Sequence, residues 1–358
     1  MEIDSEEEWF LESIKRYKQL IMFDSGNPIK QMELNDFETM CLLCEKNSEQ
    51  KYLTVLKLPT KVTQTYLGSN EIQLNSDLKI MSGLFLPSPL CRITAIYGEK
   101  RLLATNDVGL MIYNIKVSDT DQIGYNTTLN FPLYYPYIAL INKSTAILTK
   151  DTRKKSLIAD LSNGEILRDF VLDENVCNDL IPVCLNENLI ALTEKTNGTT
   201  HLHDWRSNEK REKIHAGDEG DAALFPASRY SYIQNSNPSN NICFLSQSGV
   251  FKTYDLRDSS KPLMKHNLNL STTDDNLKVK FDPNNNNIVS ISGFDSNIYI
   301  FDISQNMKEI FKHDGHSRTE DCKKYTSVTD HLWYPTQFIM SGALNNSLNC
   351  WIPDTSER

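Results

Sequence analysis

Two pairs of residues have spacings that could hold a metal ion. Cys41 and Cys44 form a C-x-x-C, the spacing of many zinc and redox sites. The chain has eight cysteines but no second C-x-x-C, and residues 40–44 (MCLLC) have the composition of a buried strand, so we expect reduced, buried thiols. His201 and His203 would share one face of a strand, but no third ligand stands near them in the sequence. We therefore predict no metal site.

Groups that could perform catalysis are also scarce. Asp218, Glu219 and Asp221 lie in a charged segment without the apolar setting that would raise the pKa of a carboxyl group. The chain has only 14 glycines, and it contains neither a glycine-rich phosphate loop nor the turn that presents a nucleophilic serine. We predict no catalytic residue and no cofactor, and hence a protein that is not an enzyme.

The charge balance argues against a broad nucleic-acid surface. The chain carries 37 basic and 47 acidic side chains, a formal net charge of −10. Proteins that bind a nucleic-acid backbone usually do so through a surface rich in Lys and Arg, which neutralise its phosphates. The densest basic run is Arg153-Lys154-Lys155. We interpret it as a solvated hairpin tip rather than a nucleic-acid patch, and we retain Arg153 and Lys154 as candidate contacts for a protein partner.

No targeting or membrane signal is evident. The first eight residues are acidic rather than basic, unlike a signal peptide, and no apolar run approaches the roughly 20 residues that cross a bilayer. We expect a soluble, cytoplasmic or nuclear protein that is monomeric on its own and contacts neither a membrane nor nucleic acid directly.

Short strands recur along the chain with a regular spacing. Five of them end at residues 114, 160, 204, 255 and 302, which lie 46, 44, 51 and 47 residues apart. This is close to the repeat of about 40–45 residues in WD propellers. An earlier unit has a central strand at 39–44 and closes at 52–58, and a last unit runs from Asp330 to Ile352. The sequence therefore predicts seven blades of an all-β, seven-bladed WD40 β-propeller.

The two ends of the chain are predicted to meet. The last unit has three strands and lacks its outermost one, and residues 20–24 (LIMFD) resemble such an outer strand. We expect the first strand to complete the last blade, because this closure removes the exposed edges of an open ring. We thus predict an N-terminal helix over residues 1–18 and the propeller over residues 19–358.

The predicted helix has a recognisable start and an apolar stripe. Ser5 and Glu8 form a capping box, and Trp9, Ile14 and Tyr17 follow at helical spacing. The stripe either packs on the side of the ring or binds a partner, so Trp9 and Tyr17 are candidate partner contacts.

Some polar residues match the structural network of WD repeats. Gly315-His316 precedes Trp351 by 35 residues, the distance between the glycine-histidine and tryptophan-aspartate pairs of a repeat. Asn345 and Ile352 replace two members of the network, so we expect it to be degraded in the last blade. Ser290 and Asp295 suggest a better but partial version in the blade before. We assign structural roles to these residues, together with Asp302 and Trp333.

A repeated Asp-x-Arg ends two successive units, Asp204-Trp205-Arg206 and Asp255-Leu256-Arg257. This pattern resembles the paired boxes of cullin-4 ubiquitin ligase substrate receptors, in which the arginines contact the ligase adaptor. Arginines at this position also occur in propellers with no ligase role. Arg206, Arg257 and the loop residue Phe294 are therefore candidate partner contacts, and the ligase receptor is the alternative function.

A more specific resemblance extends over most of the chain. The matching motifs are Trp9-x-x-Glu12-Ser13-x-x-x-Tyr17 with Phe23-Asp24, Leu56-Lys57-Leu58-Pro59, Asp255-x-Arg257-Asp258, Ile291-Ser292-Gly293-Phe294-Asp295, His313-x-Gly315-His316 and His331-x-Trp333-x-Pro335. Together they resemble the family of WD-repeat-containing protein 73. Residues 116–240 show little that matches.

The resemblance carries functional expectations. It implies a non-enzymatic protein-interaction scaffold, mainly cytoplasmic, with links to spindle poles and microtubules. It also implies association with the Integrator endonuclease heterodimer, namely the RNA-cleaving subunit and its inactive relative, with this chain as their assembly or stabilising partner.

Overall fold

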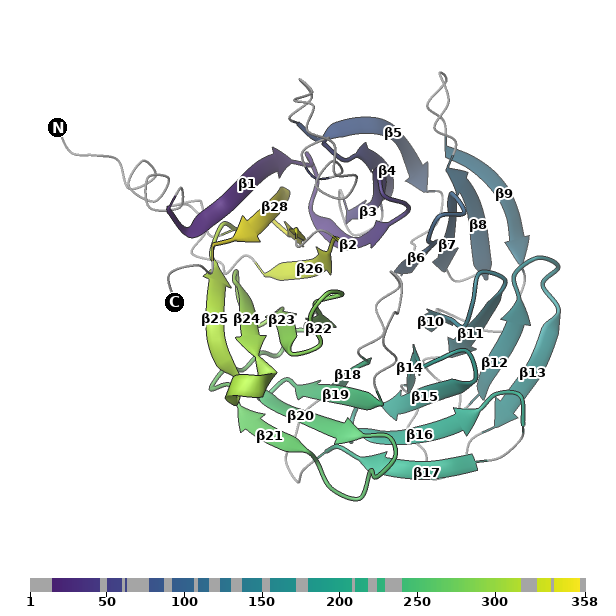
Figure 1. Ribbon diagram of the computed structural model, residues 1–358. Helices are drawn as coiled ribbons and strands as arrows, with labels where there is room; N and C mark the ends of the chain where they lie inside the picture. The colour runs from purple at the N-terminus through teal and green to yellow at the C-terminus, as the bar shows by residue number, and fades with distance from the viewer. Residues whose placement is uncertain are drawn as a thin grey trace.

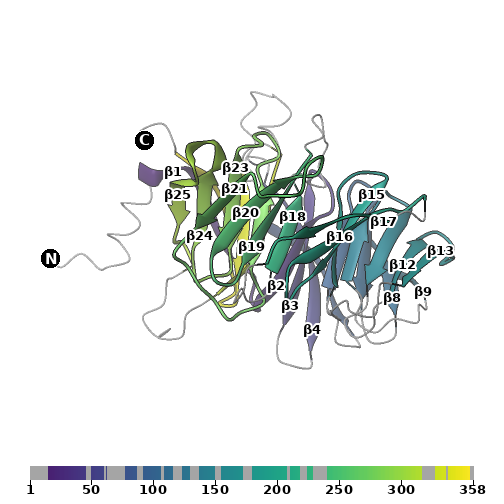
Figure 2. The same ribbon diagram turned by 90° about the horizontal axis from the view of Figure 1, so that it is seen from below.

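The chain forms a ring of seven four-stranded antiparallel sheets (Figure 1). The computed structural model describes residues 15–45, 50–59, 62, 77–86, 92–105, 109–115, 123–129, 137–149, 155–171, 180–207, 210–217, 224–228, 240–316, 327–335 and 338–354. The sheets stand side by side around an axis, and their strands run roughly along it (Figure 2). The predicted all-β propeller of seven blades is confirmed.

We number the blades in chain order and call their strands A to D from the axis outward. Blade 1 contains β2 (Ile29–Leu34), β3 (Thr39–Glu45), β4 (Lys51–Lys57) and β5 (Lys79–Leu86). Blade 2 contains β6 (Arg92–Ile96), β7 (Arg101–Thr105), β8 (Leu110–Ile115) and β9 (Ile123–Leu129). Blade 3 contains β10 (Tyr137–Leu140), β11 (Thr145–Thr149), β12 (Lys155–Asp160) and β13 (Ile166–Val171). Blade 4 contains β14 (Leu180–Cys184), β15 (Leu189–Glu194), β16 (Thr199–Asp204) and β17 (Lys210–His215). Blade 5 contains β18 (Leu224–Ser228), β19 (Asn241–Ser246), β20 (Val250–Asp255) and β21 (Met264–Asn267). Blade 6 contains β22 (Lys278–Phe281), β23 (Ile288–Ser292), β24 (Ile298–Asp302) and β25 (Lys308–His313). Blade 7 contains β26 (Val328–Trp333), β27 (Ile339–Ala343), β28 (Ser347–Pro353) and β1 (Tyr17–Asp24).

The spacing of the repeat corresponds to one strand of each blade. The five predicted strand ends at 114, 160, 204, 255 and 302 all fall in or at the end of strand C, in β8, β12, β16, β20 and β24. A 3-10 helix, η1 (Ile303–Gln305), follows the last of these. Because antiparallel strands alternate in direction, the A–B turns of all blades and the C–D turns of blades 1 to 6 lie at one end of the ring, which we call the AB/CD face. The B–C turns and the links between blades lie at the other end.

The core consists of apolar layers between neighbouring blades. In strand B of blade 1, β3, every residue but the last is buried, and in β15 every residue is buried. Such strands are covered on both faces, so they are continuous apolar runs rather than alternating ones. One layer joins blades 7 and 1 through Met32, Leu42 and Met340, and the next joins blades 1 and 2 through Leu53 and Leu102. No blade can bury both of its faces alone, so the ring is the cooperative unit.

The first strand closes the ring, as predicted. β1 pairs with β28 in an antiparallel register that places Leu20 opposite Trp351 and Phe23 opposite Leu348. Tyr17 extends the closure to blade 6. Its buried ring packs edge-on against Phe311, with the ring centroids 5.3 Å apart, and its hydroxyl lies 2.7 Å from Nδ1 of His313.

The predicted boundary of the N-terminal helix is wrong by two residues. Lys15 and Arg16 are helical, but β1 begins at Tyr17, and residues 1–14 of the predicted helix lie outside the described residues. Tyr17 does continue the helical spacing of Trp9 and Ile14. The pocket beside Phe311 and Trp351 buries its ring in the extended conformation instead, and tertiary packing overrides the local pattern. No helix within the described parts of the chain is long and apolar enough to cross a membrane.

Deleting residues 1–25 tests the closure. The deletion removes the buried Tyr17 side chain and the partly buried Leu20, Ile21 and Phe23. Full burial of such a side chain contributes roughly 1.5–3 kcal/mol, and partial burial contributes less. We expect the truncated chain to melt about 10 °C lower or more, or to aggregate through the exposed edge of β28, in a thermal denaturation followed by circular dichroism. Lys18→Ala, at a lysine whose side chain is 53% exposed, is the control and should leave the melting temperature unchanged. Unchanged melting of the truncated chain would refute the closure.

Candidate functional site

An aspartate ends strand C in four consecutive blades, 3 to 6. In each case the carboxylate accepts a hydrogen bond from the backbone N–H two residues further on: Asp160 from Ser162 at 2.7 Å, Asp204 from Arg206 at 3.1 Å, Asp255 from Arg257 at 2.9 Å and Asp302 from Ser304 at 2.9 Å. The aspartates therefore hold the C–D turns of the AB/CD face in one conformation. The structural role predicted for Asp302 agrees with this geometry, because its carboxylate also caps η1.

The two Asp-x-Arg motifs have the same geometry in neighbouring blades. Arg206 donates to both carboxylate oxygens of Asp204, from Nε at 3.2 Å and Nη2 at 3.1 Å, and Arg257 donates to Asp255 in the same way. The hydrogen bonds from the arginines hold the pKa of each aspartate at about 2. The arginine side chains are nevertheless 57% and 74% exposed. Both guanidinium groups are thus held in place on the AB/CD face, with surface left for an acidic or carbonyl group of another molecule.

The network predicted to be degraded in blade 7 is connected. Trp351 Nε1 donates to Ser341 Oγ at 3.3 Å, and Ser341 Oγ lies 2.8 Å from Nε2 of His316. On its other side the His316 ring contacts Ser347, which donates to Asn345. Because Ser347 uses its proton for Asn345, His316 donates from Nδ1 and accepts from Ser341 at Nε2. Asn345 stands at the hairpin position as predicted, and Ser347 connects it to His316, so the network expected to be degraded is continuous.

The partial network predicted in blade 6 is divided between two sites. Asp295 accepts from the Tyr299 hydroxyl at 2.7 Å and from Asn297 within the B–C turn of blade 6. Ser290 instead accepts from Trp333 Nε1, 2.7 Å away on β26 of blade 7. The two residues therefore do not act together, and the residue placed relative to Ser290 as Trp351 is placed relative to Ser341 is Asp302 rather than tryptophan.

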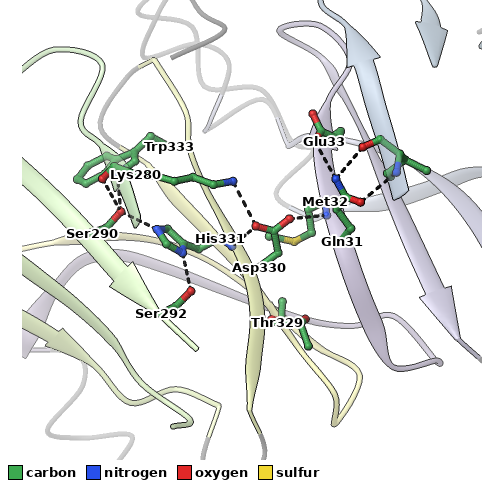
Figure 3. Close-up of polar contacts among 12 residues, drawn as sticks. Gln31, Met32, Glu33, Lys280, Ser290, Ser292, Thr329, Asp330, His331 and Trp333 are labelled. Atoms are coloured by element: carbon green, nitrogen blue, oxygen red, sulfur yellow. Dashed lines mark hydrogen bonds and ion pairs between the residues drawn. The ribbon is translucent and has the colours of Figure 1, made fainter. Parts of the chain in front are cut away.

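A polar cluster links the inner strands of blades 6, 7 and 1 (Figure 3). His331 of β26 has both ring nitrogens in contact with β23: Nε2 lies 2.7 Å from Ser290 Oγ, and Nδ1 lies 2.7 Å from Ser292 Oγ. Ser290 Oγ also lies 3.3 Å from the carbonyl oxygen of Lys280. The neutral ring thus satisfies every polar group of this contact.

Asp330 extends the cluster to blade 1. One carboxylate oxygen accepts from the Lys280 ammonium of blade 6 at 3.2 Å, and the other accepts from the backbone N–H of Met32 in blade 1 at 3.0 Å. The side chain of Asp330 is 3% exposed. Burial opposes its ionisation, but the ammonium groups of Lys280 and Lys278 outweigh burial and lower its pKa. One carboxylate therefore connects three blades.

Gln31 continues the cluster from blade 1 to blade 2. Its side-chain amide makes two hydrogen bonds with the backbone of Ile93, donating to the carbonyl at 2.7 Å and accepting from the N–H at 3.0 Å. It also donates to Glu33 at 3.1 Å. Burial raises the pKa of Glu33 to about 7, although the charge of Lys280 acts in the opposite direction. Glu33 thus titrates near neutrality at the inner edge of the ring.

The charges of the inner strands are confined to one part of the ring. The A strands of blades 6, 7, 1 and 2 contain Lys278 and Lys280, Asp330, Lys30 and Glu33, and Arg92. The A strands of blades 3, 4 and 5 have no charged residue. The charged part combines a lysine, a carboxylate and hydrogen-bonded neutral groups, and it holds blades together rather than presenting a nucleophile with a base.

Relatives of the chain share one description. It is 26% identical to the "Integrator complex assembly factor WDR73" of Danio rerio, over 98% of both chains. Proteins with the same description from Xenopus laevis and Homo sapiens are 22% and 21% identical, over 95% and 98% of this chain and 96% and 98% of their own. No protein-family model matches the chain.

The chain is similar to WDR73 proteins over nearly its full length. Similarity over nearly the full length of these WDR73 proteins includes residues 116–240, where sequence motifs alone showed little to match. The family resemblance predicted from the N-terminal and C-terminal motifs is confirmed.

The residues predicted to contact a partner differ in their exposure to solvent in the structure. Trp9, Arg153 and Lys154 lie outside the described residues. Tyr17 is buried in the ring closure, and Phe294 is partly buried against the core of blades 5 and 6. Arg206 and Arg257 are the predicted contacts that the structure exposes.

Asp330 and Lys280 were not predicted from the sequence to have a role, and His331 was identified only as part of the motif His331-x-Trp333-x-Pro335. A charged or histidine side chain in an innermost strand, where other blades carry apolar residues, is the signal that could have identified them.

The cysteine and histidine pairs do not form a metal site in the described parts of the chain. Cys41 packs in the layer between blades 1 and 2, and Cys44 in the layer between blades 7 and 1, because residues three apart on a strand point to opposite faces. Burial raises the pKa of both thiols. His201 pairs with Glu194 at 2.7 Å. Among the described residues, no three His, Cys, Asp or Glu side chains are grouped to hold an ion.

Replacing Asp330 should destabilise the ring more than replacing another structural aspartate. Asp330→Ala leaves the Met32 N–H and the Lys280 ammonium without their acceptor, and because the Lys280 side chain is 31% exposed the loss should be about 2–3 kcal/mol, below that of a fully buried ion pair. Asp302→Ala removes a cap on the surface and should cost about 1 kcal/mol. Urea unfolding followed by tryptophan fluorescence measures both losses. Equal losses for the two variants would mean that Asp330 does not couple the blades.

Stability should fall in mild acid because of the buried histidines. Burial lowers the pKa of His331 and His316 to about 3. Below pH 6.5 these two histidines are therefore protonated in the unfolded chain but remain neutral in the folded chain. Each histidine then lowers the free energy of unfolding by about 1.4 kcal/mol per pH unit.

His331→Asn should make this acid dependence shallower between pH 6.5 and 5 by that amount. Glu33 acts in the opposite direction over this range, since its raised pKa favours the folded state as pH falls, but it contributes to both proteins and cancels in the comparison. His266→Asn, in outer strand β21, is the control. Parallel pH profiles for wild type and His331→Asn, from urea unfolding at each pH, would contradict the assignment.

Proposed function

We propose that this protein is a non-enzymatic scaffold for assembly of the Integrator complex, acting on its endonuclease subunit and the inactive relative of that subunit. The observation that carries the proposal is similarity over nearly the whole chain to proteins described as Integrator complex assembly factors. We further propose that the encounter takes place in the cytoplasm and that a separate pool associates with spindle poles.

The architecture suits a scaffold. The interblade layers and the inner polar cluster make the ring rigid, while the turns on its two faces can vary without disturbing the core. The polar groups described above are paired with one another or with the backbone, and this supports a structural use of residues that elsewhere could be catalytic. In the proposed role the nuclease and its metal ions belong to the partner.

The alternative function, a cullin-4 ligase receptor, is favoured by one observation. Arg206 and Arg257 occupy equivalent, exposed positions on the AB/CD face of adjacent blades. Their bidentate bonds to Asp204 and Asp255 also have a purely local use, which is to hold the C–D turns. The two functions therefore differ in whether these arginines contact another protein.

One experiment separates the two functions. The tagged full-length chain is purified from native cytosol, and the eluate is analysed by mass spectrometry for the Integrator endonuclease pair and for the ligase adaptor. The double variant Arg206→Ala and Arg257→Ala is purified in parallel. We expect both proteins to retain the Integrator pair at equal levels.

Absence of the Integrator pair from the wild-type eluate would overturn the proposal. A ligase adaptor that is present with wild type and lost from the double variant would favour the receptor. Melting temperatures of the two proteins, which should agree within about 2 °C, show whether any loss comes from unfolding.

A further inference from the structure

The outermost strand of blade 1 has an unusual edge. β5 ends the strand order β2-β3-β4-β5, so within the described residues its outer edge is paired with no other strand. It is eight residues long, with the sequence KIMSGLFL, and it carries no charge after Lys79. An outer edge presents backbone donors and acceptors that can pair with another strand.

Two large apolar side chains are exposed on this strand. Ile80 is 56% exposed and Phe85 is 62% exposed. A bulge between Val55 and Leu56 places both on the same side of the blade: Ile80 lies opposite Leu56, and Phe85 lies opposite Tyr52. Leu56 and Tyr52 belong to the layer between blades 7 and 1, so Ile80 and Phe85 form a strip on the side that faces blade 7.

Gly83 makes the strip continuous. It lies between the two apolar residues, and the Tyr52 ring occupies the space that a Cβ atom would need, since such an atom would stand 1.6 Å from the Tyr52 hydroxyl. The ring of Tyr52 also packs on Phe85, with the centroids 4.8 Å apart. The exposed side of β5 therefore presents Ile80, the Tyr52 ring with its hydroxyl over Gly83, and Phe85 in succession.

Several other outer strands carry charges that discourage pairing, and the uncharged outer strand β9 has the more polar sequence IGYNTTL. β25 exposes Lys308, Glu309 and Lys312, and the sequence of β17 begins Lys-Arg-Glu-Lys. Charged side chains on an edge prevent another strand from joining it, because the new pair would desolvate them or place like charges opposite one another. β5 lacks this protection along seven of its eight residues.

We propose that two copies of this chain associate through β5, edge to edge and antiparallel, and bury Ile80 and Phe85 of both copies. The edge is complementary to itself, since residues 80–86 of the two copies can face one another in either direction without bringing charges together. The monomer expected from the sequence is then the form found at low concentration. A contact of one eight-residue strand per copy is small, so the dimer should be weak, with a dissociation constant on the order of 10–100 μM.

Sedimentation velocity of the full-length chain between about 1 and 200 μM tests the proposal. We expect the average mass to rise from one chain toward two. Phe85→Lys should weaken the association about tenfold or more, because it places two lysines in the contact. The matched control is Leu263→Lys, at a residue 60% exposed beside β21 of blade 5, which should associate like wild type.

Hydrogen exchange at the two ends of this concentration range gives a second readout. The amides of residues 79–86 should exchange more slowly at high concentration, while those of β21 should not change. Ile80→Lys provides an independent variant if Phe85→Lys melts at a lower temperature than wild type.

A mass of one chain at every concentration would overturn the proposal. So would an equal effect of Leu263→Lys, or a dimer whose β5 amides show no added protection.

Discussion

Pairing of β1 with β28 is the interaction on which the rest of the ring depends. Each apolar layer lies between two blades, so blade 7 can be buried on both faces only if the ring returns to blade 1. β1 supplies the fourth strand of blade 7 and joins the two ends of the chain in one sheet. Tyr17 connects the same strand to His313 of blade 6, so the closure spans two blades rather than one.

The inner edge of blade 7 is held by contacts of a different kind. His331 is hydrogen-bonded to blade 6, and Asp330 joins blade 6 to blade 1 through Lys280 and the backbone of Met32. Thr329 adds a hydrogen bond at 2.7 Å to the carbonyl of Ile29. Apolar layers tolerate small slips of one sheet on another, whereas these polar groups lose their partners if a blade shifts. The cluster therefore fixes the position of the closing blade relative to both neighbours.

The repeat and the closure could be predicted from the sequence because both leave local signals. Strand C ends on Asn or Asp at a regular spacing, and residues 20–24 have the composition of a missing outer strand. The contacts of Ser290 could not be predicted in this way, because its partners His331 and Trp333 stand in another blade. Asn345 could be identified at the hairpin position, but the part played by Ser347 was hidden, since Ser347 links His316 to Asn345 in a way that the motif does not specify. The start of β1 at Tyr17 depends on a pocket formed by distant residues, and helical spacing alone gives no sign of it.

The chain order of the closing strand has a consequence for biosynthesis. β1 leaves the ribosome before every other described strand, and its partner β28 is the last of these strands to be made. Until then Ile21 and Phe23 have no blade to cover them, and Trp351 has not been translated. The nascent protein thus carries β1 as an unpaired apolar strand until β28 has been made, and chaperones protect intermediates of this kind. Closure of this ring is therefore expected only after β28 has left the ribosome, as a late step of folding.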